Sequence, residues 1–204
     1  MDMDTRAKLI EVATPLFATK GFAAVSVREL TEAAKINVSA ISYHFNGKEG
    51  LYKAILEEQL TPILMLLQSV KSKNGLSPVE RLMDYANQIA SIHTQRPFLA
   101  RFINNEANNP TNHIGPMIED HLSQVYEFIV NTLEEGIVKG EFRANLNTSY
   151  SAISLVGILN FYFIIKPLIR RIAPLNIKEH ANTEYIVHAF QLYLHGIMDQ
   201  TQAK

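Results

Sequence analysis

"GFAAVSVRELTEAAKINVSAISYHFNGKEGLYKAIL", Gly21 to Leu56, contains two short helical patterns with almost no chain between them. The first pattern starts at Ser26, and Glu29 three residues later completes the sequence signature of a capping box. Asn37 is the next residue suited to an N-cap, which leaves only Lys35-Ile36 for the connection. Two short helices joined by so tight a turn are typical of a helix–turn–helix motif.

The second of these helices is short and has two different edges. Val38, Ile41 and Phe45 recur at i, i+3 and i+7, which predicts a buried edge. The pattern stops at Asn46-Gly47, and Lys48 begins another helical run. A helix that enters the major groove of DNA can be this short, because only its N-terminal part reaches the base edges. The side chains predicted on its outer face are Val38, Ser39, Ser42 and Tyr43.

The composition narrows the function classes. The chain has 204 residues, of which 47% are hydrophobic, so it can bury a sizeable core. It has no cysteine, which excludes a disulfide framework and a cysteine-based zinc site. The formal net charge is −1, and residues 1–60 carry seven Lys/Arg against eight Asp/Glu. Recognition of DNA must therefore come from local pattern rather than from a basic surface.

Helical spacing continues along the rest of the chain, and strand-like alternation is scarce. A first helix is predicted to end at Lys20-Gly21, and a fourth to begin at Lys48, with Pro62 as a possible kink. Proline, glycine and capping residues then separate the remaining helices. Their predicted ranges are 78–93, 97–107, 116–139, 148–171 and 177–200. The predicted fold class is all-α.

The quoted stretch resembles the DNA-binding segment of the tetracycline-repressor-like (TetR) family over about residues 5–56. The family usually has glycine where Lys35 stands, serine where Asn37 stands and tyrosine where Ser42 stands. The matching features are Gly21-Phe22, Ser26, Ala33-Ala34, Ile41, His44-Phe45, Lys48-Glu49 and Leu51.

The resemblance implies a domain arrangement and a function. It implies a helix–turn–helix domain over residues 1–47 and a helical ligand-binding and dimerisation domain over residues 48–204. The expected protein is a homodimeric repressor that binds a palindromic double-stranded DNA operator and leaves it when a small-molecule effector binds.

Carried over residue by residue, the resemblance implies two sets of DNA contacts. Physical reasoning supports part of the division, because Arg28 can pair with guanine and the methyl groups of Val38 and Ala40 can meet a thymine methyl. Three alternatives stay open: Arg28 as a solvated surface charge, His44 as a packed hinge, and Ala40 as a packing residue. The phosphate-facing set is Ser26, Asn37, Ser42, Tyr43, His44 and Lys48. The base-facing set is Arg28, Val38, Ser39 and Ala40.

The C-terminal helices contain polar or aromatic residues among apolar ones, as a ligand pocket requires. Each of them could equally be an ordinary core or surface residue. The candidates for lining a ligand pocket are Tyr85, His93, Arg101, Phe102, Asn105, Tyr126, Asn160 and Tyr162. The asparagine-rich segment 101–110, RFINNEANNP, resembles a segment of some family members.

Metal and membrane sites are not predicted. His188 and His195 lie seven residues apart, too far to share one ion, and no zinc-binding helix motif occurs. The apolar stretch from Leu155 to Ile165 is shorter than the roughly 20 residues that span a bilayer. It predicts a helix buried on most sides inside a bundle. The N-terminus lacks a signal-peptide pattern, so a cytoplasmic protein without a cofactor is expected.

Helix 148–171 is apolar on more than one face, and the last helix adds further apolar residues. Two such helices from each subunit predict a four-helix interface with two-fold symmetry. The favoured function is therefore a ligand-responsive transcriptional regulator. The alternative is a helical homodimeric interaction protein without operator binding. An enzyme is not expected, because the sequence has no glycine-rich phosphate loop, nucleophile motif or paired catalytic carboxylates.

Overall fold

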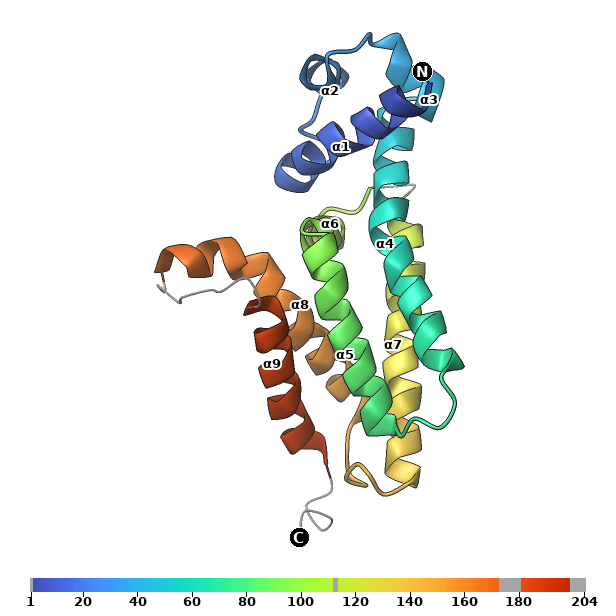
Figure 1. Cartoon of the computed structure of the whole chain (residues 1–204), viewed down its shortest axis with the longest axis vertical. Helices are drawn as coiled ribbons and strands as arrows, with labels where there is room; N and C mark the ends of the chain where they lie inside the picture. The colour runs from blue at the N-terminus through green and yellow to red at the C-terminus, as the bar shows by residue number, and fades with distance from the viewer. Residues whose placement is uncertain (1, 112–113, 173–180, 199–204) are drawn as a thin grey trace. The chain divides into compact units, whose positions relative to one another are not determined.

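The computed structural model describes residues 2–111, 114–172 and 181–198, and this part of the chain is all-α, as predicted (Figure 1). Helix boundaries agree with the predicted ones to within a few residues, and residues 177–180 and 199–200 of the last predicted helix lie outside the described residues. The helices are α1 (Asp2–Lys20), α2 (Val27–Ala34), α3 (Ser39–Phe45), α4 (Lys48–Ser72), α5 (Pro78–Gln95), α6 (Leu99–Asn108), α7 (Gly115–Val138), α8 (Thr148–Ile172) and α9 (Ala181–Ile197).

The helices group into two compact units. The head unit consists of Met1–Thr61 together with Phe98–Ile118, and the C-terminal unit consists of Pro62–Pro97 and Glu119–Lys204. Helix α6 therefore belongs to the same unit as the helix–turn–helix segment, which the sequence did not indicate. The domain boundary between residues 47 and 48 stays a prediction.

The head unit is built on α1 and the first part of α4. Leu9, Ala13 and Phe17 are buried at spacings of four residues, so one stripe of α1 faces the core. The helix ends where Gly21 takes a φ of +78°, a left-handed conformation that glycine adopts without a Cβ penalty. Helix α4 begins at Lys48 as predicted and continues through Pro62 as one helix.

The C-terminal unit begins with a well-capped helix. Ser77 accepts a hydrogen bond from the backbone N–H of Glu80, and the Glu80 carboxylate accepts one from the backbone N–H of Ser77. Pro78 occupies the first turn, where its missing N–H is not needed. Further along the unit, the Phe142 ring fills the space beside Gly136 so closely that a Cβ there would lie 2.1 Å from it.

The prediction that α8 is buried on most sides is wrong within one chain. Ala152, Leu155, Leu159 and Tyr162 are buried, but the opposite face of the helix is not. Only 28% of its most apolar window is buried, and α8 is the one described helix long and apolar enough to cross a membrane by length and composition. Its exposed large apolar side chains are Tyr150, Ile153, Phe161, Leu168 and Ile172.

Candidate nucleic-acid interface

Helix α2 starts where the sequence predicts. The Ser26 hydroxyl oxygen accepts a hydrogen bond of 3.1 Å from the backbone N–H of Glu29. The Glu29 carboxylate in turn accepts a 2.5 Å hydrogen bond from the Lys20 ammonium at the end of α1. This bond holds the pKa of Glu29 below its usual value. The cap and the ion pair together fix the start of α2 beside the end of α1.

The turn between α2 and α3 contains an unusual lysine. Lys35 has φ 54° and ψ 50°, and its backbone N–H bonds back to the carbonyl oxygens of Glu32 and Thr31. A left-handed conformation costs a residue with a Cβ about 1–2 kcal/mol. The position where the TetR resemblance implies glycine thus keeps the glycine conformation here, despite the lysine side chain.

We expect Lys35→Gly to stabilise the protein by about 1 kcal/mol, because the strain at a positive φ outweighs the added freedom of the unfolded chain. The Lys35 side chain is exposed, so little packing is lost. Urea unfolding of both proteins measures the difference. Lys35→Ala, which removes the side chain but keeps the Cβ, is the control and should leave stability nearly unchanged. A Lys35→Gly protein that is less stable than the parent would contradict the argument.

Asn37 caps α3 as predicted. Its side-chain oxygen accepts hydrogen bonds from the backbone N–H and the hydroxyl of Ser39, at 3.0 and 3.1 Å. The backbone N–H of Ala40 bonds to the carbonyl oxygen of Asn37. Helix α3 begins at Ser39, and Val38 directly before it has helical φ and ψ and makes no side-chain cap bond, so the cap comes from Asn37 one residue earlier.

One edge of α3 is buried and the other is open. Ile41 and Phe45 pack into the head unit, and the Arg6 guanidinium lies 5.2 Å from the centroid of the Phe45 ring. Val38 is 55% exposed, so its placement on the buried edge is wrong and its placement on the outer face is confirmed. Tyr43 is 75% exposed. Ser39 and Ser42 are also exposed, whereas Ala40 and His44 are half-buried. The outer face of α3 is thus available to a groove.

The Arg28 side chain projects from α2 into solvent and makes an exposed ion pair. Its guanidinium donates a 2.7 Å hydrogen bond to the Glu32 carboxylate one turn later, and both side chains are largely exposed. Exposed pairs of this kind contribute only about 0–1 kcal/mol. Arg28 can therefore exchange Glu32 for a base edge at small cost.

Lys48 has a structural role that the sequence did not indicate. Its ammonium donates hydrogen bonds of 3.0 and 2.9 Å to the carbonyl oxygens of Phe22 and Val25, and it lies 4.2 Å from the centroid of the Phe22 ring. These contacts tie the start of α4 to the α1–α2 loop. Both hydrogen-bond acceptors are neutral, so they do not cancel the charge of Lys48. Its phosphate contact stays a prediction.

Gly50 is a further residue that sequence reasoning missed. A Cβ at this position would lie 1.7 Å from the carbonyl oxygen of Phe45, the last residue of α3. Two left-handed residues, Asn46 with φ 59° and Gly47 with φ 112°, turn the chain sharply between α3 and α4. Gly50 therefore allows α3 to lie against the first turn of α4.

Five of the predicted ligand residues lie in the C-terminal unit, and three of these are close together. The Nε2–H of His93 donates to the side-chain oxygen of Asn160 at 2.8 Å, because the Asn160 amide nitrogen donates to Val156. The His93 ring stacks on Phe163 at 4.0 Å, and burial lowers the pKa of His93 to about 4. Next along α8, the Tyr162 ring packs edge-on against Phe163.

The remaining predicted ligand residues do not join this group. Tyr85 is buried 5.7 Å from Phe128, ring to ring, and the hydroxyl of Tyr126 bonds to that of Ser149. Arg101, Phe102 and Asn105 lie on α6, in the head unit. The eight residues therefore form no single site within the described chain. A ligand-binding role for any of them stays a prediction.

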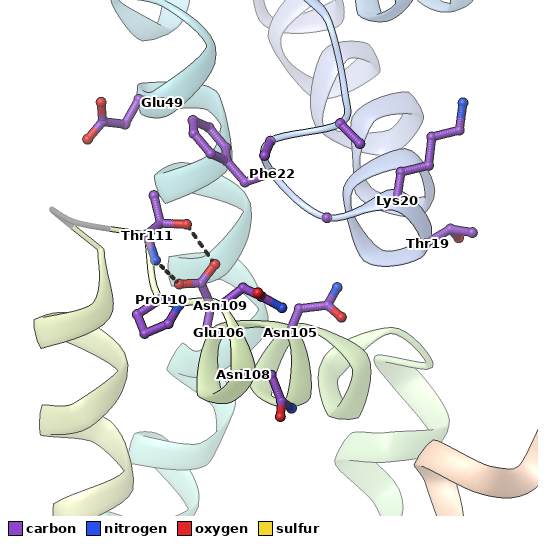
Figure 2. Close-up of a pocket in the computed structure, with 13 residues that line it drawn as sticks. Thr19, Lys20, Phe22, Glu49, Asn105, Glu106, Asn108, Asn109, Pro110 and Thr111 are labelled. Carbon is purple, nitrogen blue, oxygen red and sulfur yellow. Dashed lines mark hydrogen bonds between the residues drawn. The ribbon is translucent and has the colours of Figure 1, made fainter.

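The head unit also contains an open cleft of about 860 Å³ (Figure 2). Glu106 is buried at its edge, and its carboxylate accepts hydrogen bonds from the Tyr52 hydroxyl at 2.6 Å and from the hydroxyl and backbone N–H of Thr111, each at 2.9 Å. Burial and the neighbouring carboxylate raise the pKa of Tyr52. Of the predicted ligand residues, only Asn105 lines this cleft.

Comparison with known proteins decides the family. Residues 9–55 match the family model described as "Bacterial regulatory proteins, tetR family", and residues 78–191 match "Tetracyclin repressor-like, C-terminal domain". The chain belongs to the TetR family. The resemblance of the helix–turn–helix segment is thereby confirmed, and the C-terminal helices belong to the same family.

Relatives within the TetR family are regulators. The "Probable HTH-type transcriptional regulator YttP" of Bacillus subtilis is 31% identical over 70% of this chain and 69% of its own length. The ketosteroid transcriptional regulator KstR2 of Mycobacterium tuberculosis has the same fold, with a TM-score of 0.76, 22% identity and coverage of 96% and 95% of the two chains. AibR, solved with isovaleryl coenzyme A and operator DNA, has a TM-score of 0.75, 16% identity and coverage of 92% and 97%.

Proposed function

We propose that this TetR-family chain is a DNA-binding transcriptional repressor that a small molecule releases from a palindromic operator. The observation that carries the proposal is the open outer face of α3 on a firmly capped helix–turn–helix. Val38, Ser39 and Ala40 lie in the first turn of α3 or directly before it, where a recognition helix reaches base edges. Ser42 and Tyr43 follow, and their hydroxyl groups can donate hydrogen bonds to phosphate oxygens.

The charge balance of the head favours binding by two copies together. Residues 1–60 carry a net charge of −1, so counterion release adds little to non-specific affinity. A single α3 offers only a few base contacts. We infer that the affinity comes from two heads on adjacent half-sites about 34 Å apart, as in other dimeric helix–turn–helix proteins.

The exposed stripe of α8 supports a homodimer. Ile153, Phe161 and Leu168 are each at least 50% exposed, and Leu192 on α9 is 61% exposed. Gly157 on α8 has open space around it, which lets another helix approach closely. A second copy that presents the same face would cover the stripe with two-fold symmetry. We propose α8 and α9 as this interface.

An effector for the C-terminal domain is proposed from the family. AibR, solved with isovaleryl coenzyme A and operator DNA, shows that a protein of this fold can bind a small molecule. For this chain the chemical identity of the C-terminal effector is left open. We further propose that the protein acts in the cytoplasm and is not an enzyme, because its relatives are regulators.

The function is tested by selecting bound sequences from a random DNA pool and measuring variants on a panel of operator mutants. Arg28→Ala should relax preference at one base position, where it costs about 1–3 kcal/mol. Tyr43→Ala should weaken binding to all sequences about equally, because its contact is to phosphate. Lys53→Ala is the matched control, since Lys53 pairs with Glu57 one turn away, as Arg28 does with Glu32.

Two outcomes would contradict these assignments. If Arg28→Ala lowered the affinity for all operator variants equally, Arg28 would not contact a base. Selection that yields no salt-dependent binder would favour the alternative, a helical homodimeric interaction protein without operator binding.

A further inference from the structure

The cleft in the head unit is walled by two segments that are far apart in the sequence (Figure 2). One wall is the end of α1 and the turn that follows it, Thr19–Ala24, and the other is the end of α6 with the residues after it, up to Thr111. Glu49 of α4 also lines it. Its volume of about 860 Å³ lies in the range of small-molecule sites, and all its lining residues belong to the head unit.

Two asparagines of the walls present acceptor oxygens to a ligand. The amide nitrogen of Asn105 donates to the carbonyl oxygen of Ala18, and that of Asn108 donates to Asn104, so the side-chain oxygens of both residues are available as acceptors. Glu49 adds an exposed carboxylate, and an ionised carboxylate accepts hydrogen bonds but donates none. The side chains of the cleft thus suit a ligand with several donors.

The charges of the cleft point the same way. The Glu106 carboxylate is buried, and the donors that the described part of the chain supplies to it are a tyrosine hydroxyl, a threonine hydroxyl and a backbone N–H, all neutral. Lys20 is the cation among the lining residues, and its ammonium is bonded to Glu29. Within the described residues the Glu106 carboxylate has no cationic partner, which makes the local potential negative and favours a positively charged ligand.

We propose that this cleft binds a small organic cation with several N–H donors, such as an amine or guanidinium compound, and that binding there changes operator affinity. The second half of the proposal rests on the proposed function. The site differs from an effector pocket in the C-terminal unit, because every residue that lines it lies in the head unit.

The contacts around the cleft give the ligand a direct route to the helix–turn–helix. Phe22 lines the cleft, its ring lies 5.0 Å from the Tyr52 ring, and its carbonyl oxygen accepts from Lys48 at the start of α4. Tyr52 donates to Glu106 at the opposite wall. A ligand that separates the walls would therefore disturb the contacts that hold the α1–α2 loop against α4. By linkage, operator DNA should weaken ligand binding by the same factor.

Calorimetry with agmatine, which carries one guanidinium and one ammonium, tests binding without DNA. The parent protein should show saturable binding. Ala24→Trp, at an exposed lining position, should fill the cleft and weaken binding at least about tenfold. Glu49→Gln should weaken it about two- to fivefold, as expected for loss of one exposed charge pair. Glu57→Gln, an exposed glutamate on α4 that does not line the cleft, should leave it unchanged.

Any of three results would overturn the binding site. The parent protein could show no saturable binding at millimolar agmatine, agmatine could bind Ala24→Trp as tightly as the parent, or the uncharged polyol ribitol could bind the parent as tightly as agmatine does. Operator titration with and without agmatine then tests regulation, and Ala24→Trp controls for ionic effects of agmatine on DNA. Agmatine that binds but leaves operator affinity unchanged overturns the regulatory half. A protein that binds agmatine but no operator instead overturns the proposed function and leaves the site in place.

Discussion

Gly50→Ala is expected to abolish operator binding while the C-terminal unit stays folded. A Cβ at position 50 would lie 1.7 Å from the carbonyl oxygen of Phe45, and that oxygen belongs to the backbone, so no side-chain rotation relieves the clash. Helix α3 or the first turn of α4 must move instead. Displacement of this kind places the change among the strongly destabilising substitutions, at about 3 kcal/mol or more.

The effect is measured by operator affinity and by hydrogen exchange in the two units. Affinity should fall at least about 100-fold, since each 1.4 kcal/mol corresponds to a factor of ten. Exchange should increase in α2 and α3. Gly115→Ala is the control, because among the described residues a Cβ there meets the Pro110 side chain at an ordinary 3.6 Å, within the same head unit. A Gly50→Ala protein with parental affinity would show that the α3–α4 turn is not rigidly set by this contact.

Phe161→Glu is expected to convert the proposed dimer to a monomer and to weaken operator binding strongly. Phe161 is 57% exposed on the apolar stripe of α8. If a second copy covers this stripe, the substitution buries an unpaired carboxylate in the interface twice, once from each subunit. Each burial costs several kcal/mol, so the dimer dissociation constant should rise by about 1,000-fold or more.

Sedimentation and light scattering measure the oligomeric state, and the same samples are titrated with operator. Val138→Glu places the same charge on a residue that is 87% exposed on α7, outside the proposed interface, and should leave the dimer intact. Phe161→Leu keeps an apolar side chain and should also preserve it. A Phe161→Glu protein that remains dimeric would place the interface elsewhere.

Local features of this chain could be predicted from the sequence because their causes are local. Ser26, Asn37 and Ser77 cap helices through bonds that span only two or three residues. Gly21 ends α1 because only glycine takes its φ of +78° without strain. The helix–turn–helix spacing, the helix ranges and the family therefore followed from residue order alone. Most of the outward face of α3 followed as well, but the same periodicity also placed Val38 on the buried edge, where it does not lie.

Contacts between side chains that are far apart in the sequence could be found only in the tertiary structure. The Tyr52–Glu106 bond joins residues 54 positions apart, and the His93–Asn160 bond joins residues 67 apart. Neither residue of a pair carries a local pattern that names its partner. The same reason explains why the eight predicted ligand residues scatter over two units: their types suit a pocket, but helix packing decides which faces converge. Lys48 and Gly50 acquired their roles from neighbours that the fold supplies.

The exposure of α8 shows the same division at the level of a whole helix. Its sequence determines that more than one face is apolar, and periodicity alone predicts burial on most sides. The fold of one chain covers the face with Leu155 and Leu159 and leaves Ile153, Phe161 and Leu168 in solvent. The hydrophobic effect favours the removal of an apolar surface from water, but it is non-directional and does not select which surface covers it. Which faces are covered within the chain is decided only when the helices pack.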